Sequence, residues 1–199
     1  KSLGILIDQE KRKSFISNEI IKLSKSKKIK INLKKDLLDE ITNIVEKPKI
    51  LFCEFDKKYL TIPKEILIIS MQNHQKYFPT FDNKDNLTNN FIVIADKKDS
   101  KGLIRLGNER VIEARLNDAE FFWNKNRSQN LVKQVSKLKN INYFKGLGTY
   151  FDKVQRIRKL CGIISDEMLI SKEKIEIASS ICKVDLMSGL VGEFPELQG

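Results

Sequence analysis

The chain has 199 residues, of which 41% are hydrophobic and 32% charged, a composition typical of a globular protein and not of a disordered tail. Its 37 Lys and Arg residues against 26 Asp and Glu give a formal net charge of +11, which favours a polyanionic partner through counterion release. No apolar run is long enough to span a membrane, and the start KSLGILID is too short in apolar residues for a signal peptide, so we expect a cytoplasmic protein.

The first fifty residues predict one short strand and two helices. Residues 2–7 favour an apolar strand, and Asp8 is placed to cap a helix that ends in the lysine run of residues 22–30. An amphipathic pattern predicts a second helix over residues 35–45, and Pro48 blocks its continuation.

The next part of the chain predicts a mixture of strands and a helix. Residues 50–55 are typical of a buried strand, and Pro63 fits the first turn of a helix that runs to about Asn73. Residues 77–81 and 91–95 predict two strands, and the segment DNKDNLTNN between them has the composition of a turn. We therefore expect an antiparallel hairpin here.

Helical patterns dominate the rest of the chain. Residues 107–124 predict a long helix and residues 131–138 another, and beyond Gly146-Leu147-Gly148 only helical periodicity is visible. We expect an α+β protein with a domain boundary at these glycines. Residues 1–146 would form a mixed α/β domain, and residues 147–199 a helical segment.

The residues that could support catalysis or metal binding are few. His74 is the single histidine; it could in principle serve Cys53, but no local motif supports such a pair. Cys53, Cys161 and Cys182 form no CxxC pattern, which predicts free thiols in a reducing compartment and no zinc site. The glycines of KGLGTYFDK are expected to connect helix to helix, as a hinge and not as a phosphate loop. We predict no catalytic residue and no metal ligand.

Arginines and aromatic residues cluster in the long predicted helix. Arg105, Arg110 and Arg115 recur every five residues, which rotates each by about 140° from the last, so they cannot share one face. A surface ion pair between Arg115 and Asp118 is at least as consistent with the sequence as RNA binding is. For Phe121-Phe122-Trp123, core packing is the favoured interpretation and base stacking the minor one.

Four stretches are much more specific than these features. In this order and spacing they closely resemble the beta subunit of bacterial heterotetrameric glycyl-tRNA synthetase: SMQNHQKYFPTFD (residues 70–82), GNERVIEARLNDAEFFW (107–123), KGLGTYFDKVQRI (145–157) and KVDLMSGLVGEFPELQG (183–199). The resemblance covers nearly the whole chain and is weakest in its first fifty residues. Because that beta subunit is much longer, the resemblance implies a segment from its N-terminal half, without the C-terminal anticodon-binding region. The Lys at position 1 agrees with this expectation.

The resemblance implies a function, partners and two domain types. In that family the alpha subunit holds the class II active site, with its ATP and Mg²⁺, and attaches glycine to tRNA(Gly). The beta subunit supplies tRNA binding. Its first part is similar to the editing-type domain of the phenylalanyl enzyme's beta subunit, and the helical part is similar to the HD phosphohydrolase fold. The implied partners are tRNA(Gly), the alpha subunit and a second beta subunit, and no cofactor is expected in this segment itself.

Neither hydrolytic activity of those two domain types is expected here. An HD hydrolase needs His and Asp ligands for its metal, but no histidine precedes Asp185 and none lies in residues 149–199. Glycine is the smallest amino acid, so a pocket can exclude larger ones by size and has less need of a second editing site.

Our main hypothesis is a non-catalytic tRNA-binding scaffold. Lys and Arg would neutralise phosphates, while His74 and Tyr77 could stack or form hydrogen bonds. The predicted RNA-binding residues are His74, Gln75, Lys76, Tyr77, Arg110, Arg115, Lys145, Lys153 and Arg156. Two alternatives stay open: a docking module for the alpha subunit or other beta domains, and a hydrolase of mischarged tRNA or phosphoesters centred on His74. An AT-rich genome could also account for the lysine surplus.

Overall fold

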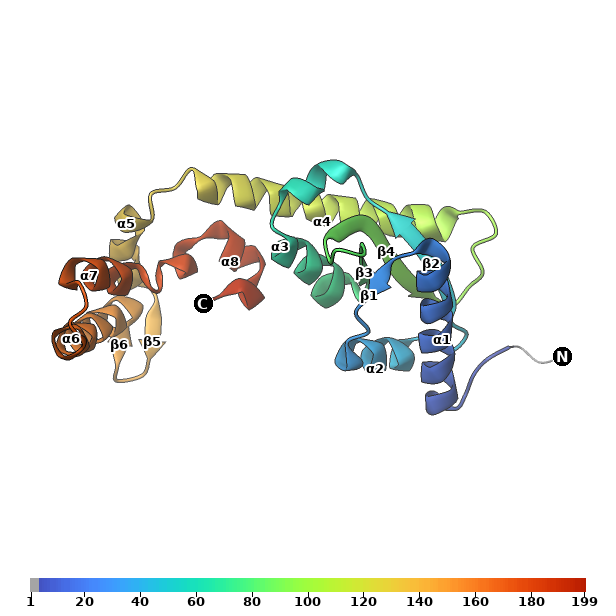
Figure 1. Cartoon of the computed structure of the whole chain (residues 1–199), viewed down its shortest axis with the longest axis horizontal. Helices are drawn as coiled ribbons and strands as arrows, with labels where there is room; N and C mark the ends of the chain where they lie inside the picture. Colours follow the sequence, from blue (N-terminus) through green and yellow to red (C-terminus); the bar gives the residue numbers. More distant parts are fainter. Residues whose placement is uncertain (1–3) are drawn as a thin grey trace. The chain divides into compact units, whose positions relative to one another are not determined.

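The computed structural model describes residues 4–199, apart from the side chain of Leu131. The described chain is a mixed α+β protein, as predicted (Figure 1). Close contacts divide it into a first unit that ends at Glu120 and a second unit that runs from Phe121 to Gly199. This division falls within helix α4 (Leu103–Arg127), and the predicted boundary after residue 146 lies inside the second unit. The editing-type and HD-like identities of the two parts stay predictions.

The first unit begins with two helices that the sequence predicted. Asp8 caps α1 (Gln9–Lys27) by accepting a hydrogen bond from the Lys11 backbone N–H at 2.8 Å, and α2 (Lys35–Ile44) follows. The strand expected over residues 2–7 is wrong for residues 4–7, which have no regular structure; residues 2 and 3 lie outside the described chain. The Leu6 N–H donates a hydrogen bond to the Glu46 carbonyl at 2.9 Å, but residues 4–7 do not pair with a neighbouring strand.

A four-stranded antiparallel sheet forms the centre of the first unit. Its strands β1 (Lys30–Ile31), β2 (Lys49–Glu54), β3 (Phe78–Phe81) and β4 (Leu87–Ala95) are ordered β1-β3-β4-β2. The predicted hairpin is therefore confirmed as β3–β4. Its turn is held by Asp82, whose carboxylate accepts hydrogen bonds from the N–H groups of Lys84 and Asn86, each at 2.8 Å.

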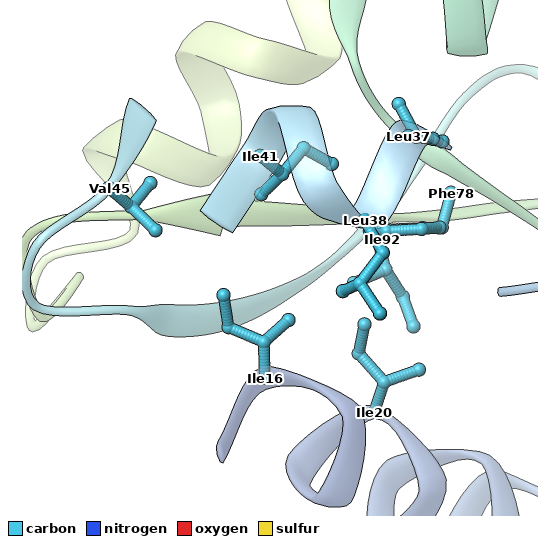
Figure 2. Packing of buried hydrophobic residues seen from close by; sticks show 8 residues of the cluster. All are labelled: Ile16, Ile20, Leu37, Leu38, Ile41, Val45, Phe78 and Ile92. Carbon is cyan, nitrogen blue, oxygen red and sulfur yellow. The ribbon is translucent and has the colours of Figure 1, made fainter. Parts of the chain in front are cut away.

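One face of this sheet packs against α1 and α2. Phe78 and Ile92 are opposite each other in the β3–β4 register, so they lie on the same face. Figure 2 shows them with the buried side chains that the two helices contribute: Ile16 and Ile20 from α1, and Leu37, Leu38, Ile41 and Val45 from α2 and its C-terminal end. Removing these side chains from water is the main stabilising contribution on this side.

The other face of the sheet packs against a second set of elements. Cys53 and Phe91 are paired in register and point away from the first face, because successive strand residues alternate. The elements on this side are a 3-10 helix (Lys57–Thr61), α3 (Lys64–Ile69), a π-helical turn (Ser70–His74) and the first part of α4. The Tyr59 hydroxyl, buried in this layer, donates to Asn117 Oδ1 of α4 at 2.6 Å.

The second unit is mainly helical. Its described elements are α5 (Leu131–Gln134), a 3-10 helix (Val135–Asn140), β5 (Asn142–Phe144), β6 (Gly148–Thr149), α6 (Tyr150–Met168), α7 (Lys172–Ile181), a 3-10 helix (Val184–Met187), α8 (Gly189–Glu193) and a 3-10 turn (Pro195–Leu197). The β5–β6 hairpin was not predicted. The expectation that the glycines of KGLG connect two helices is wrong, because they form this hairpin's turn and lead into α6. No helix of the described chain has the length and apolar character needed to cross a membrane.

Candidate nucleic-acid interface

The β5–β6 hairpin places a lysine and an aromatic ring at an exposed turn. Gly146 and Gly148 have φ angles of +82° and +80°, a conformation that other residues rarely adopt, and this allows the chain to reverse within a few residues. The Leu147 N–H donates to the Phe144 carbonyl at 3.0 Å and closes the turn. Lys145 is exposed at this turn, and Phe144 beside it keeps 67% of its surface in solvent.

The start of α6 is fixed directly after the hairpin. Thr149 is the N-cap: its hydroxyl accepts a hydrogen bond from the Asp152 N–H, and Asp152 Oδ2 accepts one from the Thr149 N–H at 2.7 Å. These hydrogen bonds, that from the Thr149 backbone above all, hold the pKa of Asp152 below its ordinary value. Arg156 Nη1 then donates to the Leu147 carbonyl at 3.0 Å, so the first turns of α6 are tied back to the hairpin.

Cations and aromatic rings alternate at this junction. Lys153 Nζ lies 3.9 Å from the centroid of the Tyr143 ring, and the rings of Tyr143 and Tyr150 meet edge to face at 5.3 Å. Lys139 Nζ lies 4.8 Å from the centroid of Phe151. We call the following residues the hairpin cluster: Lys139, Tyr143, Phe144, Lys145, Tyr150, Phe151, Lys153 and Arg156. Cations beside aromatic faces are the chemistry with which proteins hold phosphates and stack unpaired bases.

The structure thus brings three of the predicted RNA-binding residues, Lys145, Lys153 and Arg156, into one site of the second unit. The aromatic members of the hairpin cluster were missed. Their signal in the sequence is NYFKGLGTYFDK, in which two aromatic pairs flank a glycine-rich turn and lysines follow each pair. The pattern could have been found, but the short strands that bring the pairs together left no periodicity to detect.

Tyr77, predicted to face RNA, is part of the core of the first unit. It is only 5% exposed, its ring stacks on Phe91 with centroids 5.0 Å apart, and its hydroxyl donates to Asn108 Oδ1 at 2.7 Å. Burial raises the pKa of Tyr77 to about 12. The ring lies inside the first unit, stacked on Phe91, and offers no exposed face to a base.

The neighbours of Tyr77 are only partly accessible. His74 ends the π-helical turn, and both His74 and Gln75 are half-buried. Lys76 adopts a left-handed conformation with φ +58°, and its ammonium group forms an ion pair with Glu40 at 2.9 Å. A phosphate at Lys76 would therefore compete with a carboxylate that is already in place.

Arg110 and Arg115 lie on α4, separated by the rotation that the sequence predicts. Arg110 is exposed and borders a cavity of about 340 Å³ whose lining includes the carboxylates of Glu54, Asp56, Glu109 and Glu113. Arg115 is half-buried. Because like charges repel, the carboxylates around Arg110 disfavour a polyanion at this cavity. The hairpin cluster is the better candidate for a nucleic-acid interface.

In the described part of the chain, the side chains that could support catalysis do not converge on one site. Cys53 is 1% exposed, and burial, with a smaller contribution from the charge of Glu109, raises the pKa of its thiol to about 12, so the thiolate nucleophile is absent at neutral pH. A cavity of about 390 Å³ lies between α6 and α7, and two of the cations in its lining form ion pairs, Arg158 with Glu176 and Lys172 with Asp166. Within residues 4–199, no group of three His, Cys, Asp or Glu side chains is placed to hold a metal ion.

Comparison with known proteins matches the whole chain to one family. A family model described as "Glycyl-tRNA synthetase beta subunit" matches residues 1–199. The glycine–tRNA ligase beta subunit of Thermodesulfovibrio yellowstonii is 41% identical over 197 residues, which is 98% of this chain and 29% of that protein. The beta subunit of Lactiplantibacillus plantarum is 37% identical over 202 residues, and that of Dictyoglomus thermophilum is 41% identical over 199 residues; the aligned part is again 29% of each protein.

These relatives are subunits of an aminoacyl-tRNA ligase. The chain belongs to the glycyl-tRNA synthetase beta subunit family, and the resemblance seen in its four motifs is confirmed. It spans 29% of the length of the curated relatives that it matches.

Proposed function

We propose that this chain is a tRNA-binding, non-catalytic part of a cytoplasmic glycine–tRNA ligase. It would hold tRNA(Gly) while an alpha subunit, with ATP and Mg²⁺, attaches glycine to it. Two observations support the proposal: the membership of the chain in the beta subunit family and the gathering of Lys145, Lys153 and Arg156 with aromatic rings in the hairpin cluster.

The hairpin cluster carries the proposal because it joins two kinds of contact in one place. The ammonium and guanidinium groups would neutralise backbone phosphates, which supplies most of the sequence-independent affinity for a nucleic acid. The exposed ring of Phe144 would offer a stacking surface to an unpaired base. The net charge of +11 would add long-range attraction that brings the tRNA to the site.

The proposal assigns no bond-making step to this chain. The buried thiol of Cys53 and the buried hydroxyl of Tyr77 are held in their protonated forms at neutral pH, so neither supplies a nucleophile or a base. In this proposal the chemistry of glycine activation resides in the alpha subunit.

A filter-binding titration of the full-length beta subunit against tRNA(Gly) tests this function. We expect the combined variant K145A/K153A/R156A to bind at least tenfold more weakly than the wild-type protein. Lys174, an exposed residue of α7 near the opposite end of α6, provides a single-cation control outside the hairpin cluster, and K174A should bind like the wild type. Equal affinity of the triple variant and the wild type would reject the hairpin cluster as the interface.

A further inference from the structure

The positive charge of the first unit is concentrated in one short stretch, residues 22–35. This stretch runs from the last turns of α1 through β1 to the first turn of α2 (Figure 1). It holds seven lysines and no carboxylate, whereas the remaining residues of the unit hold 17 Lys and Arg against 18 Asp and Glu. A lysine surplus that came only from genome composition would be spread over the whole unit, so this distribution indicates a local cause. We call the seven residues the lysine patch: Lys22, Lys25, Lys27, Lys28, Lys30, Lys34 and Lys35.

All seven lysines are exposed, and most of them have no counter-ion. Lys22 forms an ion pair with Glu19 and Lys30 forms one with Asp85, each at 2.7 Å. Among the described residues, the other five members of the lysine patch take part in no ion pair. Because an exposed ammonium group without a paired carboxylate keeps its attraction for an anion, the lysine patch favours a polyanionic partner.

The lysines at the end of α1 are not needed to cap that helix. The Lys28 N–H donates to the Lys25 carbonyl at 3.3 Å, and the Ile29 N–H donates to the Ser24 carbonyl at 3.0 Å. Lysine side chains near a helix C-terminus can satisfy such carbonyls, but here backbone N–H groups do so. Lys25 also lies nine residues after the buried Ile16, a rotation of about 180°, so its side chain points away from the core.

Lys34 and Lys35 stand at a helix end where cations are unfavourable. Lys34 is the N-cap of α2 and Lys35 its first residue, and no side chain caps this end. The helix dipole makes an N-terminus positive, so carboxylates stabilise it and lysines weaken it, and Asp36 supplies a carboxylate in this turn. Because the two lysines weaken α2, an anionic partner is the physical account of their position.

The lysine patch differs from the hairpin cluster in its lack of stacking surfaces. Residues 22–35 include no aromatic residue. The ring of Phe52, whose centroid lies 5.1 Å from Lys27 Nζ, is half-buried against the hydrophobic core. Cations without exposed rings contact phosphates and not bases, which suits a stem whose bases are paired and stacked inside.

We propose that the lysine patch is a second RNA-binding surface, which holds the phosphate backbone of a base-paired stem. The inference rests on the proposed function for the identity of that RNA, tRNA(Gly), and it does not depend on the hairpin cluster.

Filter binding by the full-length beta subunit with K25A/K34A/K35A, which we call the patch variant, tests the inference. The probes are tRNA(Gly), an RNA duplex of about 16 base pairs and one strand of that duplex alone. We expect the patch variant to bind the tRNA and the duplex about tenfold or more weakly than the wild type does, because it loses phosphate contacts. The affinity for the single strand, which depends on stacking, should change by about twofold at most.

The matched control removes three exposed lysines of the same unit that lie outside the lysine patch, K64A/K97A/K101A. Both variants lose the same charge, and we expect the control to bind all three RNAs like the wild type. Equal losses in the two variants would overturn the proposal, since net charge alone would then account for them. Wild-type binding of the duplex and the tRNA by the patch variant would overturn it too, as would equal losses for the duplex and the single strand.

The same titrations separate the lysine patch from the hairpin cluster. If K145A/K153A/R156A binds tRNA(Gly) like the wild type while the patch variant does not, the hairpin cluster is rejected and the lysine patch stands. The reverse result rejects the lysine patch alone. If the patch variant keeps both RNAs but loses the alpha subunit in a pull-down, the surface docks a protein and the proposal is overturned.

Thermal unfolding shows whether weaker binding comes from a folding defect. The patch variant removes two cations from the positive end of α2, so its Tm should equal or exceed that of the wild type. A Tm that falls together with the affinity would contradict the proposal, because the lysines would then have a structural role.

Discussion

The hydroxyl of Tyr77 donates a hydrogen bond to Asn108 Oδ1 at 2.7 Å, and this bond joins two of the motifs that mark the family. Tyr77 belongs to the motif of residues 70–82, and Asn108 to the motif of residues 107–123. A second bond of the same kind, from Tyr59 to Asn117 at 2.6 Å, ties another buried tyrosine to α4. These two tyrosine–asparagine hydrogen bonds therefore hold α4 against the sheet of the first unit.

Replacing Tyr77 by Phe tests this structural role. The variant keeps the ring stacked on Phe91 but removes the donor to Asn108, so we expect the free energy of unfolding to fall by about 1–2 kcal/mol. Denaturant unfolding measures the loss. Because the ring is buried, tRNA binding by the folded variant should not change, and a selective loss of affinity without loss of stability would contradict our interpretation.

The buried thiol of Cys53 predicts a dependence of stability on alkaline pH. Its pKa is raised from 9.0 to about 12 in the folded chain, so the unfolded state releases this proton first as the pH rises. The stabilising contribution is therefore complete below about pH 9 and is lost progressively up to about pH 12, at about 1.4 kcal/mol per pH unit. Unfolding titrations between about pH 8.5 and 10 should show a shallower decline in the free energy of unfolding for C53A than for the wild type, and equal slopes would contradict the assignment.

Gly148 and Gly146 offer a matched pair of substitutions in the hairpin turn. A Cβ on Gly148 would lie 2.4 Å from Asp152 Oδ2, whereas a Cβ on Gly146 would meet nothing within 4 Å. Both alanine variants should lose about 1 kcal/mol because both glycines have positive φ. We expect G148A to lose about 1 kcal/mol more, since it displaces the carboxylate that caps α6. Thermal unfolding of the two variants measures the difference, and equal losses would show that the cap adapts.

Replacing Phe144 by Ala distinguishes the contribution of base stacking from that of charge in the proposed interface. Its ring is largely exposed, so F144A should leave the fold stable. If the ring stacks on an unpaired base, the variant should lose about 1–3 kcal/mol of binding free energy for tRNA(Gly), with the salt dependence unchanged. Filter binding at two salt concentrations distinguishes this outcome. Wild-type affinity in F144A would limit the interface to phosphate contacts.

The sequence predicted much of the fold because its signals are local. The cap at Asp8, the amphipathic helix that became α2 and the turn at Asp82 each depend on a few neighbouring residues. The β5–β6 hairpin was missed because strands of two or three residues show no alternation. Residues 4–7 were assigned to a strand because apolar composition cannot show whether a partner strand exists.

The candidate site was harder to predict, because exposure depends on the tertiary structure. Tyr77 and Lys145 stand in equally specific motifs, yet Tyr77 is buried against Phe91 and Lys145 is exposed at a turn. Similarly, the pairing of Lys76 with Glu40 joins residues 36 positions apart, which no local pattern indicates. The sequence therefore indicated cationic and aromatic candidates and could not separate those that face solvent from those that hold the core.

The salt dependence of tRNA(Gly) binding tests the central claim most directly. For the full-length beta subunit, the logarithm of the association constant should fall linearly with the logarithm of salt concentration. Each phosphate contact contributes about 0.9 to the slope, so K145A/K153A/R156A should reduce its magnitude by roughly 2–3 while K174A leaves it unchanged. Parallel lines for the triple variant and the wild type would show that these three cations do not contact the phosphates of the tRNA.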